Sequence, residues 1–218
     1  MKPLATSHPP LATCPATVFL LDDEPFVVKA LTRLLKAEGF TVQAFTSPRT
    51  FLESYHPEEL SCLVLDVAMP ELNGLDLQER LTRSGLLVPI VFLTGHGDIP
   101  MGVQAIKAGA VDFLTKPVKD TDLLRAVRAA LQRAAEQRQL ISEIAMLRQR
   151  YATLTPRECE VMAHVVAGQL NKQIAADLGA GEHTIKVHRA RVMEKMGVVS
   201  VADLVRAAER MGIGKSNQ

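Results

Sequence analysis

The chain has 218 residues, of which 47% are hydrophobic and 22% charged, and its formal net charge is +1. This length suits one large or two small domains with real hydrophobic cores. No apolar run approaches the roughly 20 residues of a membrane-spanning helix, and residues 1–16 lack the apolar core of a secretion signal. We therefore expect a cytoplasmic protein that binds no membrane. Residues 1–16 are expected to form a disordered tail.

The small net charge hides an uneven distribution along the chain. Residues 1–120 contain 10 Lys and Arg against 14 Asp and Glu, whereas residues 151–218 contain 9 against 7. An acidic front half and a basic back half indicate two separate tasks, the second of them on nucleic acid. The three cysteines are far apart and lack metal-ligand spacing, which argues against a cysteine-based metal site.

The front half alternates short apolar runs with amphipathic stretches. Helix starts are predicted at Pro25, Ser47-Pro48 and Asp98. Helix ends are predicted at Gly39 and Gly109. Repeated strand-then-helix units predict an α/β fold, a doubly wound five-stranded parallel sheet with helices on both faces. The predicted strands are Val18–Leu21, Thr41–Phe45, Cys62–Leu65, Ile90–Leu93 and Val111–Leu114.

The next stretch, from Thr121 to about Arg150, contains neither proline nor glycine. Its apolar residues recur at helical spacing in two groups separated by the polar run "EQRQ". We predict that residues 17–133 form the front domain. Its last helix continues into a helical linker over residues 134–151. A coiled-coil contact between subunits along this linker is an open alternative to packing within one chain.

The back half, residues 152–218, shows no strand pattern. Thr155-Pro156-Arg157-Glu158 is a capping box with proline at the first helical position. Three further helices are predicted at Asn171–Leu178, Glu182–Met196 and Val201–Met211, with glycines between them. The prediction is an all-α four-helix domain that contains a helix-turn-helix.

Polar residues follow four of the predicted strands. Asp22 and Asp23 come after the first, Asp66 after the third, Thr94 after the fourth and Lys116 after the fifth. Because the carboxyl ends of parallel strands share one edge of a sheet, these groups should lie together. Clustered carboxylates repel unless a cation neutralises them, and oxygen ligands suit Mg²⁺. A carboxylate can also take up a phosphoryl group, with cations offsetting the charge, so Asp66 is the candidate phosphate acceptor.

The acidic pair, "LDVAMPELNG", "LTGHGD" and "AIKAGAVDFLTKP" together resemble the receiver domain of two-component response regulators, most of all its FixJ branch. The resemblance implies that a sensor histidine kinase phosphorylates Asp66. It also implies that Asp23, Asp66 and the Ala68 carbonyl bind Mg²⁺, with Asp22 assisting through water. In this family Thr94 and Phe113 would form the switch pair, and Lys116 would neutralise the phosphoryl charge.

The strings "LTPRE", "AGQLNKQIAADLG", "TIKVHRARVMEKMGV" and "VADLV" resemble the four-helix output domain of the LuxR/FixJ/NarL class. The resemblance implies that Glu182–Met196 is a recognition helix that enters the major groove of double-stranded promoter DNA. The residues expected nearest the bases are Lys186, Val187 and Ala190, and those expected at the phosphates are Lys172, Thr184, Arg189 and Arg191. Gly181 stands where a serine commonly caps this helix.

The expected function is therefore that of a DNA-binding response regulator, which dimerises once Asp66 is phosphorylated and then activates transcription, with RNA polymerase as a candidate partner. Beyond slow self-phosphorylation from small donors and autodephosphorylation, no enzymatic activity is expected. Three alternatives stay open: a phosphatase of the haloacid dehalogenase type, which would carry a second aspartate where Ala68 stands; a regulator that works without phosphate; and a small-molecule-sensing regulator.

Overall fold

The computed structural model describes residues 16–55, 60–70, 72–95 and 99–213. All but the last residue of the predicted tail lies outside these ranges. Contacts within the chain divide it into two compact units, Met1–Arg138 and Gln139–Gln218, and each is described by itself. The division falls inside the stretch predicted as the linker.

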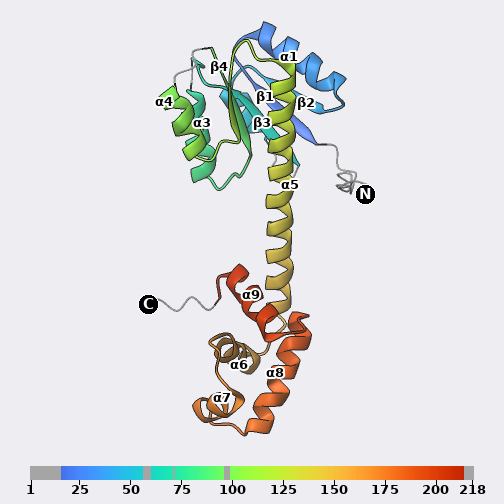
Figure 1. Ribbon diagram of the computed structural model, residues 1–218, viewed down its shortest axis with the longest axis vertical. Coiled ribbons are helices and arrows are strands. Elements are labelled where there is room, and N and C mark those ends of the chain that lie inside the picture. Colours follow the sequence, from blue (N-terminus) through green and yellow to red (C-terminus); the bar gives the residue numbers. More distant parts are fainter. Residues whose placement is uncertain (1–15, 56–59, 71, 96–98, 214–218) are drawn as a thin grey trace, which may run out of the picture. The chain divides into compact units, whose positions relative to one another are not determined.

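The first unit contains a five-stranded sheet in which every neighbouring pair is parallel, in the order β2-β1-β3-β4-β5 (Figure 1). This confirms the predicted fold, and the predicted β2 has the observed bounds. The fifth strand begins one residue later than predicted, and Asp66 and Thr94 are the last residues of their strands rather than the residues that follow them. The strands are β1 Thr17–Leu21, β2 Thr41–Phe45, β3 Ser61–Asp66, β4 Ile90–Thr94 and β5 Asp112–Thr115.

Helices cover both faces of the sheet, as a doubly wound fold requires (Figure 1). Alternate residues of the central strands pack into two separate cores, one with α1 and α5 and the other with α2, α3 and α4. Burial on both faces explains why β1, β3 and β4 read as continuous apolar runs rather than alternating ones. The helices are α1 Pro25–Ala37, α2 Pro48–Ser54, α3 Gly74–Arg83, α4 Ile99–Lys107 and α5 Asp120–Tyr151.

The helix α5 is continuous through 32 residues, so the last helix of the sheet domain and the predicted helical linker are one element. Its residues up to Leu131 pack on the sheet, and Leu147 and Tyr151 pack on the core of the second unit. Between them, Leu140 and Ile141 are 48% and 58% exposed. In the part of the chain that the structure describes, neither α5 nor any other helix combines the length and apolar character needed to cross a membrane.

The second unit holds α6 Pro156–Val166, α7 Asn171–Asp177, α8 Glu182–Met196 and α9 Val201–Met211 around one core. The predicted capping box is formed: Thr155 Oγ1 accepts from the Glu158 backbone N–H, and Glu158 Oε2 accepts from the Thr155 N–H. Ile185 and Val192 of α8 are fully buried. The all-α prediction is therefore confirmed within the described residues.

Candidate functional site: an acidic pocket and an exposed helix

The carboxyl edge of the sheet brings the predicted pocket residues together. Asp22 directly follows β1 and is anchored by its N–H, which donates to the Phe45 carbonyl at 3.2 Å. The Lys116 N–H donates to the Thr94 carbonyl at 2.7 Å, which ties the end of β5 to the end of β4. Asp22, Asp66 and Thr94 are all buried, with exposed fractions of 0%, 3% and 3%. The sheet therefore places these polar groups out of bulk water, where charge interactions are strong.

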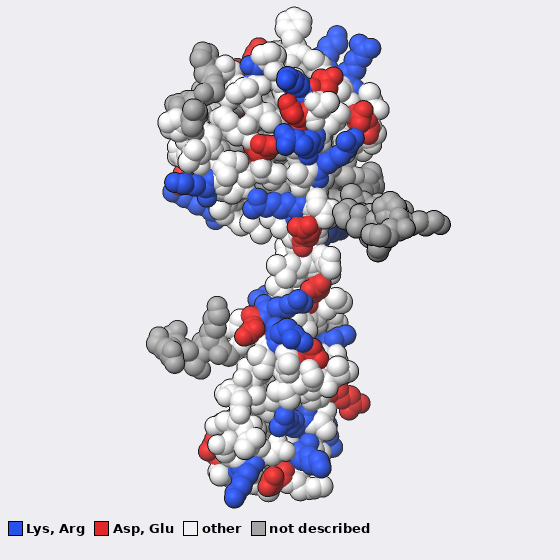
Figure 2. Space-filling model, viewed as in Figure 1, with Lys and Arg blue, Asp and Glu red and all other residues white. Residues whose placement is uncertain are grey.

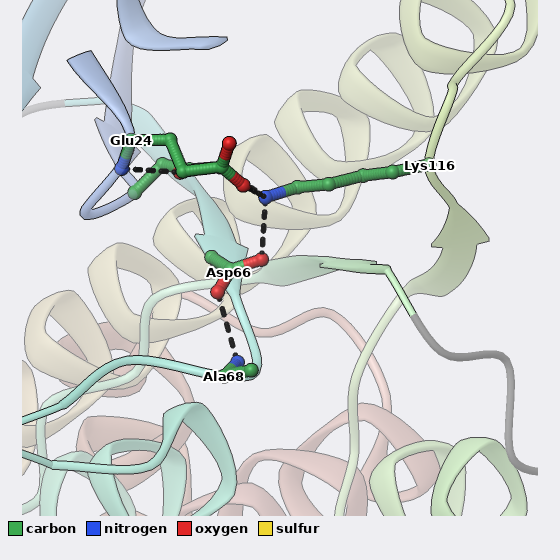
Figure 3. A network of polar contacts seen from close by, with 5 residues as sticks. Glu24, Asp66, Ala68 and Lys116 are labelled. Atoms are coloured by element: carbon green, nitrogen blue, oxygen red, sulfur yellow. Dashed lines mark hydrogen bonds and ion pairs between the residues drawn. The ribbon is translucent and has the colours of Figure 1, made fainter.

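One ammonium group holds the acidic residues together (Figure 3). Lys116 Nζ lies 2.7 Å from Asp22 Oδ2, 2.7 Å from Asp66 Oδ1 and 3.5 Å from Glu24 Oε1. The second oxygen of Asp66 accepts a hydrogen bond from the Ala68 N–H at 2.8 Å, and Asp22 Oδ1 accepts one from the Glu24 N–H at 2.9 Å. Three carboxylates thus share one cation, which leaves the pocket with an excess of negative charge.

Burial and ion pairing act in opposite directions on these groups. Burial raises the pKa of Asp22, and the contact with Lys116 offsets only part of this effect. Burial alone would lower the pKa of Lys116, but its pairs with Asp22 and Asp66 outweigh burial and raise it. Lys116 therefore stays charged at neutral pH. Its ammonium lies 2.7 Å from Asp22 Oδ2, so this buried oxygen has the Lys116 charge as its partner.

The geometry shows one cation that offsets the predicted repulsion. Lys116 lies between Asp22 and Asp66 and contacts both carboxylates. Across residues 16–55, 60–70, 72–95 and 99–213, no three His, Cys, Asp or Glu side chains are grouped closely enough to hold a metal as they stand. The donors are nevertheless hard oxygens, and three carboxylates share a single ammonium among the described residues, so the chemistry of the pocket fits Mg²⁺.

Two residues of the pocket were not assigned a role from the sequence. Glu24 contacts Lys116, and its only signal was its place in the acidic run "DDEP". Gly74 begins α3 against the end of β3, where an added Cβ would lie 2.5 Å from the Asp66 carbonyl oxygen. A side chain at this position would therefore push α3 away from the end of β3.

The predicted switch residues lie on one face of the sheet. Thr94 pairs in register with Thr115, two residues from Phe113, and side chains two apart on a strand share a face. The Phe113 ring is half-buried and packs on Phe92 with a centroid distance of 6.2 Å. Gly102 of α4 leaves it room, because an added Cβ would lie 3.2 Å from that ring.

In the second unit, α8 turns its apolar face inward and its polar face outward. Lys186, Ala190 and Arg191 are exposed, and Val187 is 38% exposed. Lys172 of α7 and Thr184 of α8 are also exposed, whereas Arg189 is half-buried and donates from Nη1 to Asn171 Oδ1 at 2.9 Å. On the face drawn in Figure 2, acidic side chains are interspersed among the Lys and Arg of this unit. Charges of both signs therefore occur together on that face of the unit.

The N-terminus of α8 lacks a side-chain cap, as predicted. Gly181 is the N-cap residue and makes no capping hydrogen bond. Its extended backbone, with φ −73° and ψ 144°, is one that serine also adopts, so the glycine is not required there by conformation.

Comparison with known proteins agrees with both halves of this description. Residues 18–128 match the family model of the response regulator receiver domain, and residues 152–208 match that of the bacterial regulatory proteins of the luxR family. The chain is 46% identical over 196 residues to the response regulator protein TodT of Pseudomonas putida, a match that covers 90% of this chain and 86% of that protein.

Two further similarities extend over most of the chain. The chain is 40% identical over 200 residues to the transcriptional regulatory protein FixJ of Rhizobium meliloti, covering 92% of this chain and 98% of that protein. The solved structure of the response regulator StyR matches with a TM-score of 0.77 and 46% identity, covering 90% of this chain and 100% of that chain. The chain therefore belongs to the two-component response regulators in which a receiver domain precedes a LuxR-type DNA-binding domain.

Proposed function

We propose that Asp66 is phosphorylated by a sensor histidine kinase and that the phosphorylated protein dimerises and activates transcription. In this proposal residues 17–133 act as the receiver, residues 134–151 as the linker and residues 152–218 as the DNA-binding domain. The observation that carries it is the Lys116 ammonium, which lies 2.7 Å from both Asp22 and Asp66 inside an acidic pocket with excess negative charge.

The transfer requires little chemistry from the protein. An Asp66 carboxylate oxygen attacks the phosphorus of a phosphohistidine, a P–O bond forms while the P–N bond breaks, and the histidine nitrogen keeps the electron pair. Because Lys116 already touches Asp66, its charge is in place to offset that of the phosphoryl group. The hydroxyl of the buried Thr94 would donate to the phosphorylated product.

A magnesium ion would be held by Asp22, Asp23 and Asp66 together with the backbone carbonyl of Ala68. When bound, it supplies positive charge to the phosphoryl oxygens, as in other phosphoryl transfers. Support comes from the oxygen-only donor set and from the three carboxylates that share the single Lys116 ammonium among the described residues. Lys116 and the ion would then together neutralise the carboxylates of the pocket.

The output rests on two further steps. Phosphorylation would bias Thr94 and Phe113 toward an active arrangement, and a preference of a few kcal/mol is enough to move such an equilibrium from mostly inactive to mostly active. The dimer would then present two copies of α8 to half-sites related by symmetry. Lys186, Val187 and Ala190 would read bases, while Lys172, Thr184, Arg189 and Arg191 would contact phosphates, and bound dimers would recruit RNA polymerase.

The test is a gel-shift titration of the full chain on a duplex that the wild-type protein selects from a random pool. The titration is run before and after treatment with acetyl phosphate and Mg²⁺. We expect treatment to strengthen binding by wild type and to leave Asp66→Asn unchanged. An Asp66→Asn protein that responds as strongly as wild type would refute the proposal.

A further inference from the structure

The C-terminal end of the recognition helix is bound by a residue of α5. The helix α8 ends at Gly197, whose φ of 65° is left-handed. The Gly197 N–H donates to the Glu194 carbonyl at 3.0 Å, and the Val198 N–H donates to the Met193 carbonyl at 3.1 Å. This is the usual glycine-terminated helix end, and it satisfies two of the last four carbonyls but not that of Met196.

The Met196 carbonyl is satisfied by Arg150, from the last turn of α5. Arg150 Nη1 donates to it at 3.1 Å. The guanidinium also lies over Gly197, because an added Cβ there would stand 2.6 Å from Nη1 and 3.0 Å from Cζ. A positive charge at the C-terminal end of a helix is favourable, since the helix dipole is negative at that end. Arg150 is therefore fitted to this helix end although the residue as a whole is exposed.

A second cation makes the reciprocal contact. Lys195, in the last turn of α8, donates to the Thr153 carbonyl at 3.1 Å and to Glu158 Oε2 at 2.6 Å. Thr153 belongs to the turn between α5 and α6, and both its N–H and its hydroxyl donate to the Arg150 carbonyl, at 3.0 Å and 2.7 Å. Arg150 thus reaches from α5 to the end of α8, while Lys195 reaches from α8 to the turn that the Arg150 backbone organises.

We propose that Arg150 is a positioning residue for DNA recognition, which holds the C-terminal end of α8 on the last turn of α5 and so fixes the direction in which the recognition helix presents its exposed face. The residues expected at the bases, Lys186, Val187 and Ala190, lie about two to three helical turns before this anchor. A helix fastened at its end and packed through Ile185 and Val192 has little freedom to tilt. This inference rests on the proposed DNA contacts of α8 but not on phosphorylation of Asp66, since every contact that carries it lies within residues 139–218.

The experiment compares Arg150→Met with Arg148→Met in the full chain. Methionine keeps an unbranched stem but removes the charge and the donors, and Arg148 is an exposed arginine of the same helix, so each variant loses one positive charge. Affinity is measured for the duplex that the wild-type protein selects from a random pool and for a scrambled duplex of the same length. We expect Arg150→Met to weaken binding to the selected duplex by about tenfold, the size of a moderate coupling between two sites, and to bind the scrambled duplex as Arg148→Met does.

An equal loss on both duplexes would overturn the proposal, because it would show that Arg150 acts only through general attraction to phosphates. So would an Arg150→Met protein that matches Arg148→Met on the selected duplex. Amide hydrogen exchange separates positioning from simple stability: the proposal expects faster exchange confined to the last turn of α8 and to Gly197 and Val198. Faster exchange throughout the core of the second unit would contradict it, because Arg150 would then hold the unit folded rather than orient one helix.

Discussion

The acidic pocket of the receiver and the capping box of the DNA-binding unit each pair a lysine with buried carboxylate groups. The two sites differ in the ratio of carboxylates to lysine. Among the described residues, Lys116 is the one cation that contacts the pocket carboxylates Asp22, Asp66 and Glu24. In the second unit, Lys195 pairs with one described carboxylate, that of Glu158, which also accepts the Thr155 N–H.

The carboxylates respond differently to these surroundings. Burial raises the pKa of Asp22 despite its lysine. Hydrogen bonds from Lys195, and then from the Thr155 N–H, lower the pKa of Glu158 to about 2. A site with more anions than cations can bind a further cation, as phosphoryl chemistry requires. An ion pair of one carboxylate and one lysine has no such surplus of negative charge. Buried ion pairs are therefore not all structural, and their local charge balance separates the two kinds.

The largest expected effect comes from removing the shared cation. Lys116→Ala leaves Asp22 and Asp66 buried without a counter-charge, and breaking a buried pair in this way costs about 3–5 kcal/mol. We expect the receiver to lose that much stability in denaturant titrations at neutral pH and to regain part of it at lower pH, where Asp22 protonates. Lys119→Ala, at an exposed position in the same connection, is the control and should behave as wild type.

The matched pair of the second unit should give a smaller effect with a different pH dependence. Glu158→Gln loses an ion pair and weakens a cap, for which we expect about 2 kcal/mol in the stability of the second unit near neutral pH. Because the pKa of Glu158 falls from 4.5 to about 2 on folding, its contribution is present in full above pH 4.5 and is lost as the pH falls toward 2.

Melting curves of wild type and Glu158→Gln should therefore differ above pH 4.5 and converge toward pH 2. Glu160→Gln, which removes an exposed carboxylate of the same helix, controls for net charge. A constant difference between wild type and Glu158→Gln across this range would show that Glu158 is not held in its charged form by folding.

The smallest expected effect concerns the N-terminal cap of α8. Gly181→Ser adds an oxygen that can accept from the first turn of α8, and the added Cβ would meet only Thr184 Oγ1, at 3.7 Å. A serine at the N-cap stabilises a helix more than a glycine does, by a few tenths of a kcal/mol. The melting temperature of the second unit should therefore rise slightly. Gly181→Ala has the Cβ without the oxygen and should not stabilise; if it did so equally, capping would not be the cause.

The fold could be predicted from sequence because its signals are local. The apolar runs from Val18, Cys62 and Ile90, the Thr155 capping box and the glycines between helices each mark an element from its own residues. The grouping of Asp22, Asp66 and Lys116 also followed, because parallel strands place their carboxyl ends at one edge.

Contacts between distant side chains could not be predicted. The bond from Arg150 to Met196 joins positions 46 apart, and no periodicity reports the reach of an arginine around the end of another helix. The need for glycine at position 74 comes from the approach of α3 to the Asp66 carbonyl, which only the packed structure shows. Likewise, the sequence placed Lys116 near the carboxylates but did not show that it contacts Asp22 and Asp66 at once.

The most direct test of the surplus of negative charge in the pocket is the uptake of phosphate on Asp66. Intact and peptide mass spectrometry would follow the full chain with acetyl phosphate, with and without Mg²⁺, for wild type and Asp66→Asn. We expect wild type to gain one phosphoryl group, only in the presence of Mg²⁺ and on the peptide that carries Asp66, and Asp66→Asn to gain none. Equal labelling of the two proteins, or labelling of wild type that is unchanged without the ion, would contradict this picture of the pocket.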